Sequence, residues 1–352
     1  MGTGAKSLAT LCLYVASSWL MGCSGETVTR PPPPPVDWAS LAARPPSPDA
    51  GPPSATAKER AAADAYLAAL ASPASPDCAA LAGVLDEDAH FAFAGLKDVF
   101  GRDNVVRAHQ ILLGAFEQRS FAVSRLLITH DSQIIEWVMT GVHKATHKRV
   151  AFKGLSLLWT KDDGAISNVR LYFDELAVSA QAGIGPKALR ALPRASEQVG
   201  VAQAASREEV DQTRSPEESA NVAVVRALLD AFENADADTY AGAMTDDVEV
   251  ASLASVEPLR GMAAARAYVK AMHRSIAELD VSIDNVWGVG PFVVVEYHIV
   301  GEQRGPLGVV PAQKNNLFKM YRVDVARLRD GKIAQIQRYD NPAQILAAPM
   351  RQ

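Results

Sequence analysis

The sequence predicts an α+β fold made of two tandem copies of one structural unit. Three landmark residues recur 160 positions later with no insertion between them: Gly101, Glu136 and Gly141 match Gly261, Glu296 and Gly301. In each copy, residues with helical spacing come first and alternating apolar residues follow. Helices followed by antiparallel strands indicate a unit whose helices cover one face of a curved sheet.

Length and charge limit the possible functions. A chain of 352 residues with 48% hydrophobic content is long enough for about two domains of ordinary size. The formal net charge of -5 offers no basic surface for nucleic acid. The composition therefore favours two globular domains that do not bind DNA or RNA.

Residues 1–22 have the pattern of a secretory signal. Lys6 precedes an apolar run that ends at Leu20, and this run is shorter than the roughly 20 apolar residues that a spanning helix needs. The run leads into Leu20-Met21-Gly22-Cys23, which resembles the lipobox of bacterial lipoproteins. The resemblance implies cleavage before Cys23 and lipidation of that cysteine. Ser24 at the next position implies an outer-membrane anchor that faces the periplasm. An ordinary secretory signal, with Cys23 incidental, is the alternative.

Residues 23–57 contain the run Pro31 to Pro35 and several further prolines. Such a segment cannot bury a core and favours extended polyproline II, so it is expected to be a semi-rigid spacer between the membrane and the folded part. If the signal is removed and Cys23 is acylated, Cys78 is the remaining cysteine. An intramolecular disulfide is then impossible.

The first unit is expected to span residues 58–183. Helices are predicted over 58–70, 78–85 and a third segment for which Asp103 is the expected N-cap. The predicted strands cover residues 89–94, 121–129, 134–142, 150–160 and 165–173. Asp162-Asp163-Gly164 is the predicted hairpin turn before the last of them.

The end of this unit resembles the SnoaL-like polyketide cyclases. The resemblance is carried by four short motifs: Asp163-Gly164-Ala165-Ile166, Tyr172-Phe173-Asp174, Gln181-Ala182-Gly183 and Gly141-Val142-His143. It implies an NTF2-like (cystatin-like) fold, a conical half-barrel of helices packed on a curved antiparallel sheet. The open end of such a cone is a pocket.

A linker over residues 184–214 leads to the second unit, residues 215–352. Ser215-Pro216-Glu217-Glu218 has the form of a capping box with proline at the first helical position. Strands are predicted over residues 248–252, 281–286, 292–301, 315–329 and 332–339, with Asp330-Gly331 as the last hairpin turn. The second unit therefore repeats the order of the first.

Alternation along the third predicted strand of each unit, residues 134–142 and 292–301, assigns its side chains to two faces. Trp137 and Tyr297 fall on the face that packs against the helices. Glu136, Glu296 and His298 fall on the outer face, where NTF2-like sheets often pack against a partner. We expect the two domains to pack through these faces as an intramolecular pseudo-dimer.

Asp174 is the candidate catalytic residue. In the cyclases that the unit resembles, an aspartate near the end of the last strand acts as acid/base, and an apolar pocket would raise its pKa. Asp174 is equally well placed to cap the following helix. In the second unit Asn341 stands at this position. The site, if catalytic, is therefore expected once.

Four aromatic residues are candidates for lining a ligand pocket: Trp137, Tyr172, Tyr297 and Tyr339. Ordinary core packing is the alternative for each. No cofactor is expected, because the sequence has no glycine-rich phosphate loop. No metal is expected either, since His143 and His147 are four apart without a third ligand in view.

Two functions fit these patterns. The first is a lipid-anchored envelope protein that binds a small hydrophobic ligand or a protein partner without catalysis. The alternative is a cofactor-independent enzyme of the cyclase or isomerase type that uses Asp174. The absence of an aspartate at position 341 favours the first.

Overall fold

The computed structural model describes residues 57–72, 76–93, 98–184, 207–255, 257–313 and 316–347. The expected signal peptide, Cys23 and the spacer up to residue 56 lie outside the described residues, as do residues 185–206 of the expected linker. The described residues form one compact unit that contains both domains. In the part of the chain that is described, no helix is both long and apolar enough to cross a membrane.

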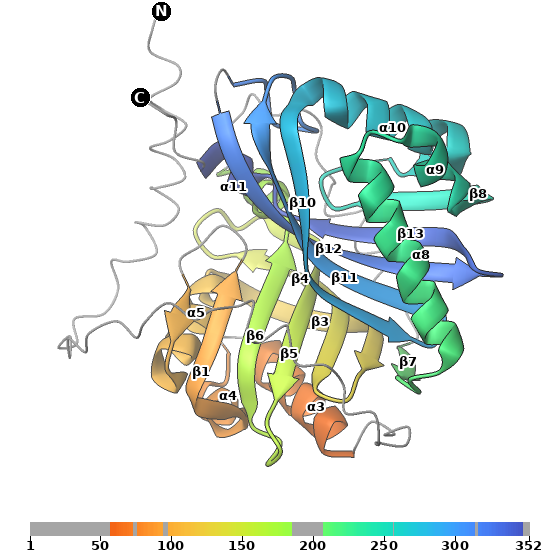
Figure 1. The fold of residues 1–352 in the computed structure, drawn as a ribbon. Coiled ribbons are helices and arrows are strands. Elements are labelled where there is room, and N and C mark those ends of the chain that lie inside the picture. The colour runs from red at the N-terminus through yellow and green to blue at the C-terminus, as the bar shows by residue number, and fades with distance from the viewer. Residues whose placement is uncertain are drawn as a thin grey trace, which may run out of the picture. The chain divides into compact units, whose positions relative to one another are not determined.

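The first domain is a mixed sheet with helices on one face (Figure 1). Its helices are α3 (Ala57–Ala71), α4 (Cys78–Val84), α5 (Arg102–Gly114) and α6 (Glu175–Ala182). Its strands are β1 (Leu85–Phe93), β2 (Val99–Phe100), β3 (Phe116–Ile128), β4 (Ser132–His143), β5 (Arg149–Thr160), β6 (Ile166–Phe173) and β7 (Glu208–Asp211). They are arranged in the order β2-β1-β6-β5-β4-β3-β7.

Two details of this domain differ from the sequence prediction. Helix α5 is capped by Gly101 at φ 86°, and Asp103 lies in its first turn without capping it. Residues 208–211, expected to be linker, form β7, which pairs in parallel with β3. Ion pairs from Arg60 to Glu209 and Asp211, and from Arg125 to Glu208, hold this polar strand at the sheet edge.

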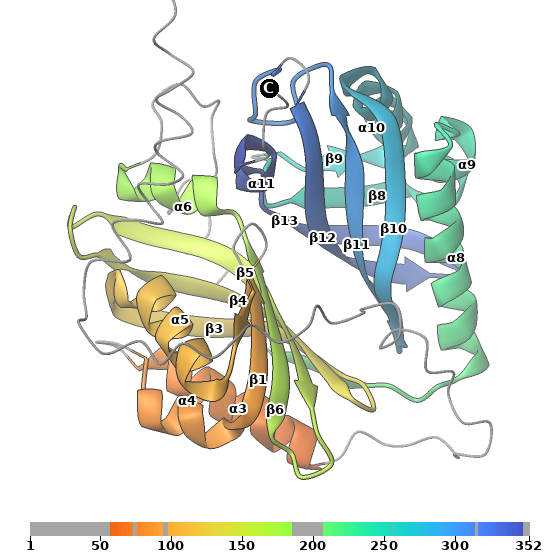
Figure 2. The same ribbon diagram turned by 60° about the vertical axis from the view of Figure 1, so that its left-hand side comes forward.

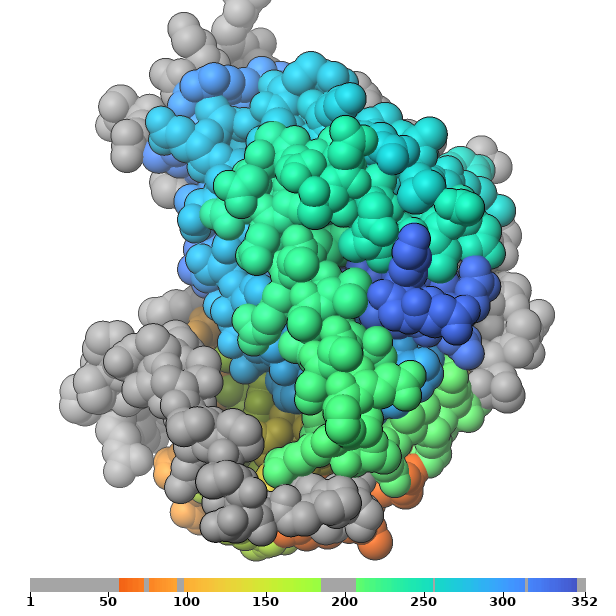
Figure 3. Space-filling view, turned by 45° about the vertical axis from the view of Figure 1, so that its right-hand side comes forward, coloured from red at the N-terminus to blue at the C-terminus, as the bar shows by residue number. Residues whose placement is uncertain are grey.

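The second domain repeats the architecture of the first. Its helices are α8 (Pro216–Glu233), α9 (Ala237–Gly242), α10 (Gly261–Ser275) and α11 (Ala343–Ala347). Its strands are β8 (Met244–Ser252), β9 (Leu259–Arg260), β10 (Ile276–Val289), β11 (Phe292–Gln303), β12 (Asn316–Arg329) and β13 (Lys332–Asp340), in the order β10-β11-β12-β13-β8-β9. In the space-filling view α8, in green, lies over this sheet at the surface (Figure 3).

The local signals predicted in the second domain are present. Ser215 and Glu218 form a reciprocal capping box at the start of α8, with Pro216 in the first turn. Asp330 and Gly331 have φ of 53° and 70°, the paired positive values that a tight hairpin turn between β12 and β13 requires. Side-chain and turn chemistry thus fix these two points of the chain locally.

The duplication extends to irregularities of the sheets. The β3–β4 pairing shifts register between Val123 and Arg125, and the β10–β11 pairing shifts between Ile283 and Asn285. The two bulges lie 160 residues apart, the same separation as the landmark residues. A β-bulge changes the direction in which the neighbouring side chains point. Arg125 and Asn285, the residues after the two bulges, are therefore oriented in the same way in both copies.

The two sheets face each other, and most of their helices lie on the outer sides, whereas α6 and α11 lie near each other at one end (Figure 2). One apolar cluster joins side chains from both sheets, among them Leu127, Leu155, Tyr172, Phe292, Val323 and Tyr339. The concave face of the first domain is occupied by aromatic side chains that contact one another: Phe93, Phe116, Phe121, Trp137, Phe152 and Phe173. These rings therefore form a continuous aromatic cluster on the concave face.

Candidate functional site

Asp174 lies between β6 and α6 and is 3% exposed. Its Oδ1 accepts hydrogen bonds from the backbone N–H groups of Leu176 and Ala177, at 2.9 and 3.1 Å, so the side chain caps α6. Its Oδ2 is also buried and has no hydrogen-bond partner among the described residues. Burial outweighs the two backbone hydrogen bonds and raises the pKa of Asp174 to about 8.

Asn341 occupies the same place in the second domain. Its Oδ1 accepts a hydrogen bond from the backbone N–H of Ala343 at 3.2 Å, at the start of α11. The same oxygen accepts one from the N–H of Glu175 at 3.3 Å, so the two helix starts touch. An uncharged amide therefore serves in the second copy where the first has a carboxyl.

The four candidate pocket aromatics lie on two different faces. Trp137 packs among the aromatic side chains of the first concave face and donates to Ser156 Oγ at 3.0 Å. Tyr297 lies in the helix-covered core of the second domain. Tyr172 and Tyr339 belong instead to the cluster between the sheets.

Between the sheets, each tyrosine donates a hydrogen bond to a buried glutamate of the other domain. Tyr339 donates to Glu136 Oε1 at 2.6 Å, and Tyr172 donates to Glu296 Oε1 at 2.5 Å. Burial, and then the neighbouring glutamate, raises the pKa of both phenols well above the usual value. Both tyrosines therefore remain protonated donors at physiological pH.

Each of these glutamates also has cationic or amide partners. Glu136 forms an ion pair with Arg125 from its own sheet. Glu296 forms one with Arg170 of the first domain at 2.5 Å and accepts a hydrogen bond from Asn285 at 2.6 Å. The carboxylates are 3% and 0% exposed, so these partners compensate the cost of burying the two charges.

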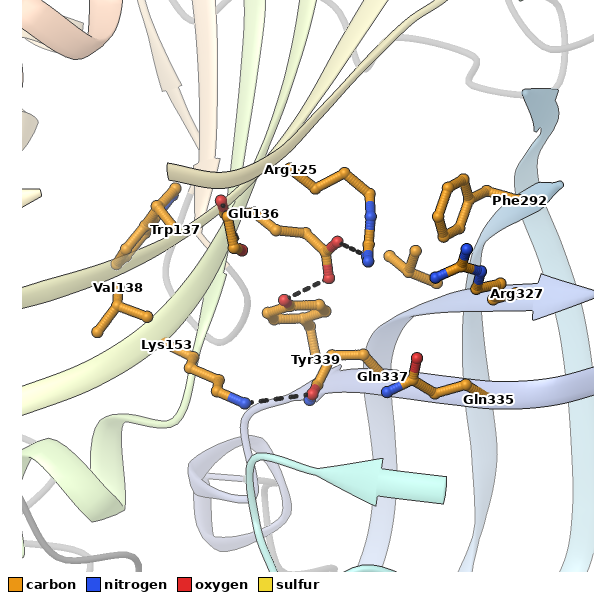
Figure 4. Close-up of a pocket in the computed structure, with 12 residues that line it drawn as sticks. Arg125, Glu136, Trp137, Val138, Lys153, Phe292, Arg327, Gln335, Gln337 and Tyr339 are labelled. Atoms are coloured by element: carbon orange, nitrogen blue, oxygen red, sulfur yellow. Dashed lines mark hydrogen bonds and ion pairs between the residues drawn. The ribbon is translucent and has the colours of Figure 1, made fainter. Parts of the chain in front are cut away.

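A cleft of about 160 Å³ opens beside Glu136, between β4 and β5 of one sheet and β12 and β13 of the other (Figure 4). Three cationic residues line it: Arg125, Lys153 and Arg327. Apolar lining comes from Val138, Phe292 and Val325. Trp137 and Tyr339 also line the cleft, whereas Tyr172 and Tyr297 are not among its lining residues.

The cations of the cleft are engaged to different extents. Arg125 is held by Glu136 and Glu208 and stacks on Phe292, with its guanidinium carbon 4.3 Å from the ring centre. Lys153 reaches Gln337 Oε1 at 3.5 Å, a long contact for a hydrogen bond. Burial lowers the pKa of Lys153, although the nearby Glu136 and Glu249 oppose the shift. The Lys153 ammonium group could therefore form an ion pair with an anion placed beside it.

The concave side of the second domain holds a second charged constellation. Arg338 donates to both carboxylate oxygens of Asp324, at 2.9 and 2.7 Å, and to the hydroxyl of Tyr268 at 2.6 Å. Tyr297 donates to Asp324 at 3.2 Å. Burial lowers the pKa of Arg338, but Asp324 and the neighbouring tyrosines outweigh it and raise this pKa well above the usual value.

Arg322 and Asp340 complete this constellation, with a 3.6 Å separation between their charged atoms. Arg322-Val323-Asp324 and Arg338-Tyr339-Asp340 place one arginine and one aspartate two residues apart on adjacent strands. The repeated Arg-x-Asp spacing is the sequence signal that could have indicated this constellation. It was missed because each pair by itself has the pattern of an exposed strand face. Strand pairing brings the two pairs together inside the cone.

The two histidines considered for a metal are joined through the backbone, where the N–H of His147 donates to the carbonyl of His143 at 2.8 Å. His143 Nδ1 lies 3.0 Å from Thr146 Oγ1, and the backbone of His147 has φ 55° in the turn. Within the described residues, no group of three metal-binding side chains comes together. His298, on the outer face, lies 2.9 Å from a carboxylate oxygen of Asp284.

Comparison with known proteins identifies both domains. The model of the SnoaL-like domain matches residues 63–169 and again residues 225–336. No curated protein matches the chain. Among solved structures, a candidate SnoaL-like polyketide cyclase from Jannaschia sp. CCS1 is 27% identical, covers 39% of this chain and 99% of its own, and has a TM-score of 0.35.

Two further solved structures are less similar in sequence. An LEH-like epoxide hydrolase from M. tuberculosis is 22% identical over 37% of this chain and 89% of its own, with a TM-score of 0.31. An NTF2-like protein from Burkholderia xenovorans LB400 is 18% identical over 37% of this chain and 95% of its own, also with a TM-score of 0.31. The two matches to the family model span more than half of the sequence. The chain therefore belongs to the SnoaL-like domain family and carries that domain twice.

Proposed function

We propose that this protein binds a small amphipathic anion, without catalysis, in the cleft between its two sheets. The observation that carries the proposal is Lys153, a largely buried ammonium group whose described partner is a single distant amide oxygen. Arg327 adds a second positive charge at the rim. Phe292 and Val325 offer an apolar surface beside them.

The size of the cleft defines the ligand class. Pockets for drug-sized ligands enclose about 300–1,000 Å³, so 160 Å³ admits only a small molecule. An aromatic or short aliphatic carboxylate or phosphate ester has the required charge and apolar part. The proposed ligand thus retains the apolar part expected from the sequence and also carries an anionic group.

Calorimetric titration with benzoate and phenyl phosphate tests this proposal, with benzyl alcohol as the uncharged analogue. We expect the anions to bind and the alcohol not to bind. Lys153→Gln and Arg327→Gln should each weaken binding about tenfold or more, because each removes one charge-assisted contact. Arg329→Gln is the matched control, since Arg329 lies on β12 with Arg327 but pairs with the exposed Asp247 outside the cleft. Binding that is unchanged in both cleft variants would refute the site.

The alternative enzyme, a cofactor-independent cyclase or isomerase, is favoured by two properties of Asp174. A pKa of about 8 and an unpaired Oδ2 would suit Asp174 as an acid/base. Its burial and its role as the cap of α6 weigh against contact with a substrate. If a substrate is found, turnover that survives Asp174→Asn would remove Asp174 from the mechanism.

We further propose that Cys23 anchors the chain in the cell envelope, facing the periplasm of an outer membrane, and that the two domains form an intramolecular pseudo-dimer. The lipobox-like sequence supports the anchor, and the hydrogen bonds between the sheets support the pseudo-dimer. Expression of the full chain in bacteria with labelled palmitate tests the anchor. Label should enter the chain and be lost in Cys23→Ser. Label that persists in this variant would exclude lipidation at Cys23.

A further inference from the structure

The two buried glutamates between the sheets are each paired with an arginine, and both arginines come from the first domain. Arg125 on β3 reaches Glu136 within the same sheet. Arg170 on β6 crosses to Glu296 of the second sheet. The symmetric pair of glutamates is thus neutralised by an asymmetric pair of cations.

The second domain has uncharged residues at both corresponding positions. Asn285 pairs with Glu296 next to the bulge of β10, as Arg125 pairs with Glu136 next to the bulge of β3. Gln337 lies two residues before Tyr339, as Arg170 lies two residues before Tyr172. Asn285 still donates a hydrogen bond to Glu296, so the position reaches the carboxylate without a charge.

These positions decide which sheets can pack together. In the observed arrangement each glutamate has one arginine. Two second-domain sheets packed in the same way would bury each Glu296 beside Asn285 and Gln337, with neither of the two ion-pairing arginines. Two first-domain sheets would place both Arg125 and Arg170 on each Glu136. A buried charge without its partner is strongly unfavourable. Two identical sheets would therefore give each buried glutamate either too few or too many arginines, whereas the observed pairing gives each glutamate one.

We propose that this placement of arginines makes the outer face of the second sheet specific for one kind of partner. That partner is a sheet that supplies a tyrosine and, two residues before it, an arginine, as the first domain does with Arg170 and Tyr172. Pairing of the second domain with another copy of itself is thereby disfavoured. The inference concerns domain pairing and does not depend on the anion site.

The repeat itself supplies the test, because it shows where a substitute arginine could be placed. In the full chain, Arg170→Gln should lower the equilibrium constant for folding by roughly a hundredfold, measured by urea unfolding. Adding Asn285→Arg should restore the equilibrium constant to within about tenfold of the parent. Position 285 of the second domain corresponds to position 125 of the first, from which Arg125 reaches Glu136. Asn285→Arg alone should not stabilise the chain, because Glu296 would then face two arginines.

Two further variants keep the test decisive. Arg170→Gln with Ser282→Arg is the matched control: Ser282 lies on the same strand but pairs with His298, so its arginine should not restore stability. Arg170→Gln with Glu296→Gln should recover soluble, cooperatively folding protein even if Arg170→Gln alone fails to fold, because no unpaired buried charge then remains at position 296. Equal recovery in the Asn285 and Ser282 variants, or none in the Asn285 and Glu296 variants, would overturn the proposal.

Discussion

The buried carboxyl of Asp174 should impose a distinctive pH dependence on stability, and Asp174→Asn should remove it. The pKa rises from its ordinary 3.8 to about 8 in the folded state. At about 1.36 kcal/mol per pH unit, this difference corresponds to on the order of 5 kcal/mol. Because the folded-state value is the higher one, this contribution is fully present below about pH 4. It declines as the pH rises to about 8.

Asparagine removes the charge and retains the cap, as Asn341 does in the second domain. We therefore expect Asp174→Asn to match the parent near pH 4 and to exceed it by several kcal/mol at pH 8. Urea unfolding followed by tryptophan fluorescence from pH 4 to 9 measures the difference. Asp77→Asn, at the exposed cap of α4, is the control for the same chemical change without burial. Parallel curves for the parent and Asp174→Asn would refute the account of this residue.

Three further predictions concern the two interiors. Burial lowers the pKa of His109 to about 4, so the parent should lose on the order of 3 kcal/mol of stability as the pH falls from about 6.5 to 4; unfolding of His109→Asn should lack this decline. Gly154→Ala should lower the free energy of unfolding by about 1–3 kcal/mol, because its added Cβ would lie 2.1 Å from Trp137. Gly242→Ala, with open space around it, should lower it by less than 1 kcal/mol, and thermal unfolding that ranks the two variants the other way would contradict the packing. Arg338→Leu should cost about 3–5 kcal/mol by leaving Asp324 buried without its cation, and adding Asp324→Leu should recover part of this loss; no recovery in chemical unfolding would show that the ion pair is not the cause.

Sequence patterns predicted the α+β class, the repeat and many of the helices and strands because these depend on local spacing. Alternation along one strand also separated Trp137 from Glu136, since neighbours on a strand point to opposite faces. It could not relate Tyr172 to Trp137. These residues lie on different strands, and the relation between their faces depends on the pairing of both with β5.

Other features required knowledge of the tertiary structure. The polar segment Glu208–Asp211 has no apolar alternation, and its pairing with β3 at the sheet edge is supported by ion pairs. Arg322 and Asp340 meet only when β12 and β13 pair. The tyrosines that donate to Glu136 and Glu296 lie 203 and 124 residues away, beyond the reach of local sequence patterns.

A double-mutant cycle between Tyr339 and Glu136 tests the contact between the domains most directly. Tyr339→Phe, Glu136→Gln and the double variant each retain the shape of the site while removing the hydroxyl, the charge or both. The 2.6 Å hydrogen bond to a buried carboxylate predicts a coupling free energy of at least about 1 kcal/mol in urea unfolding. Additive effects, with coupling indistinguishable from zero, would contradict packing of the two sheets through these residues.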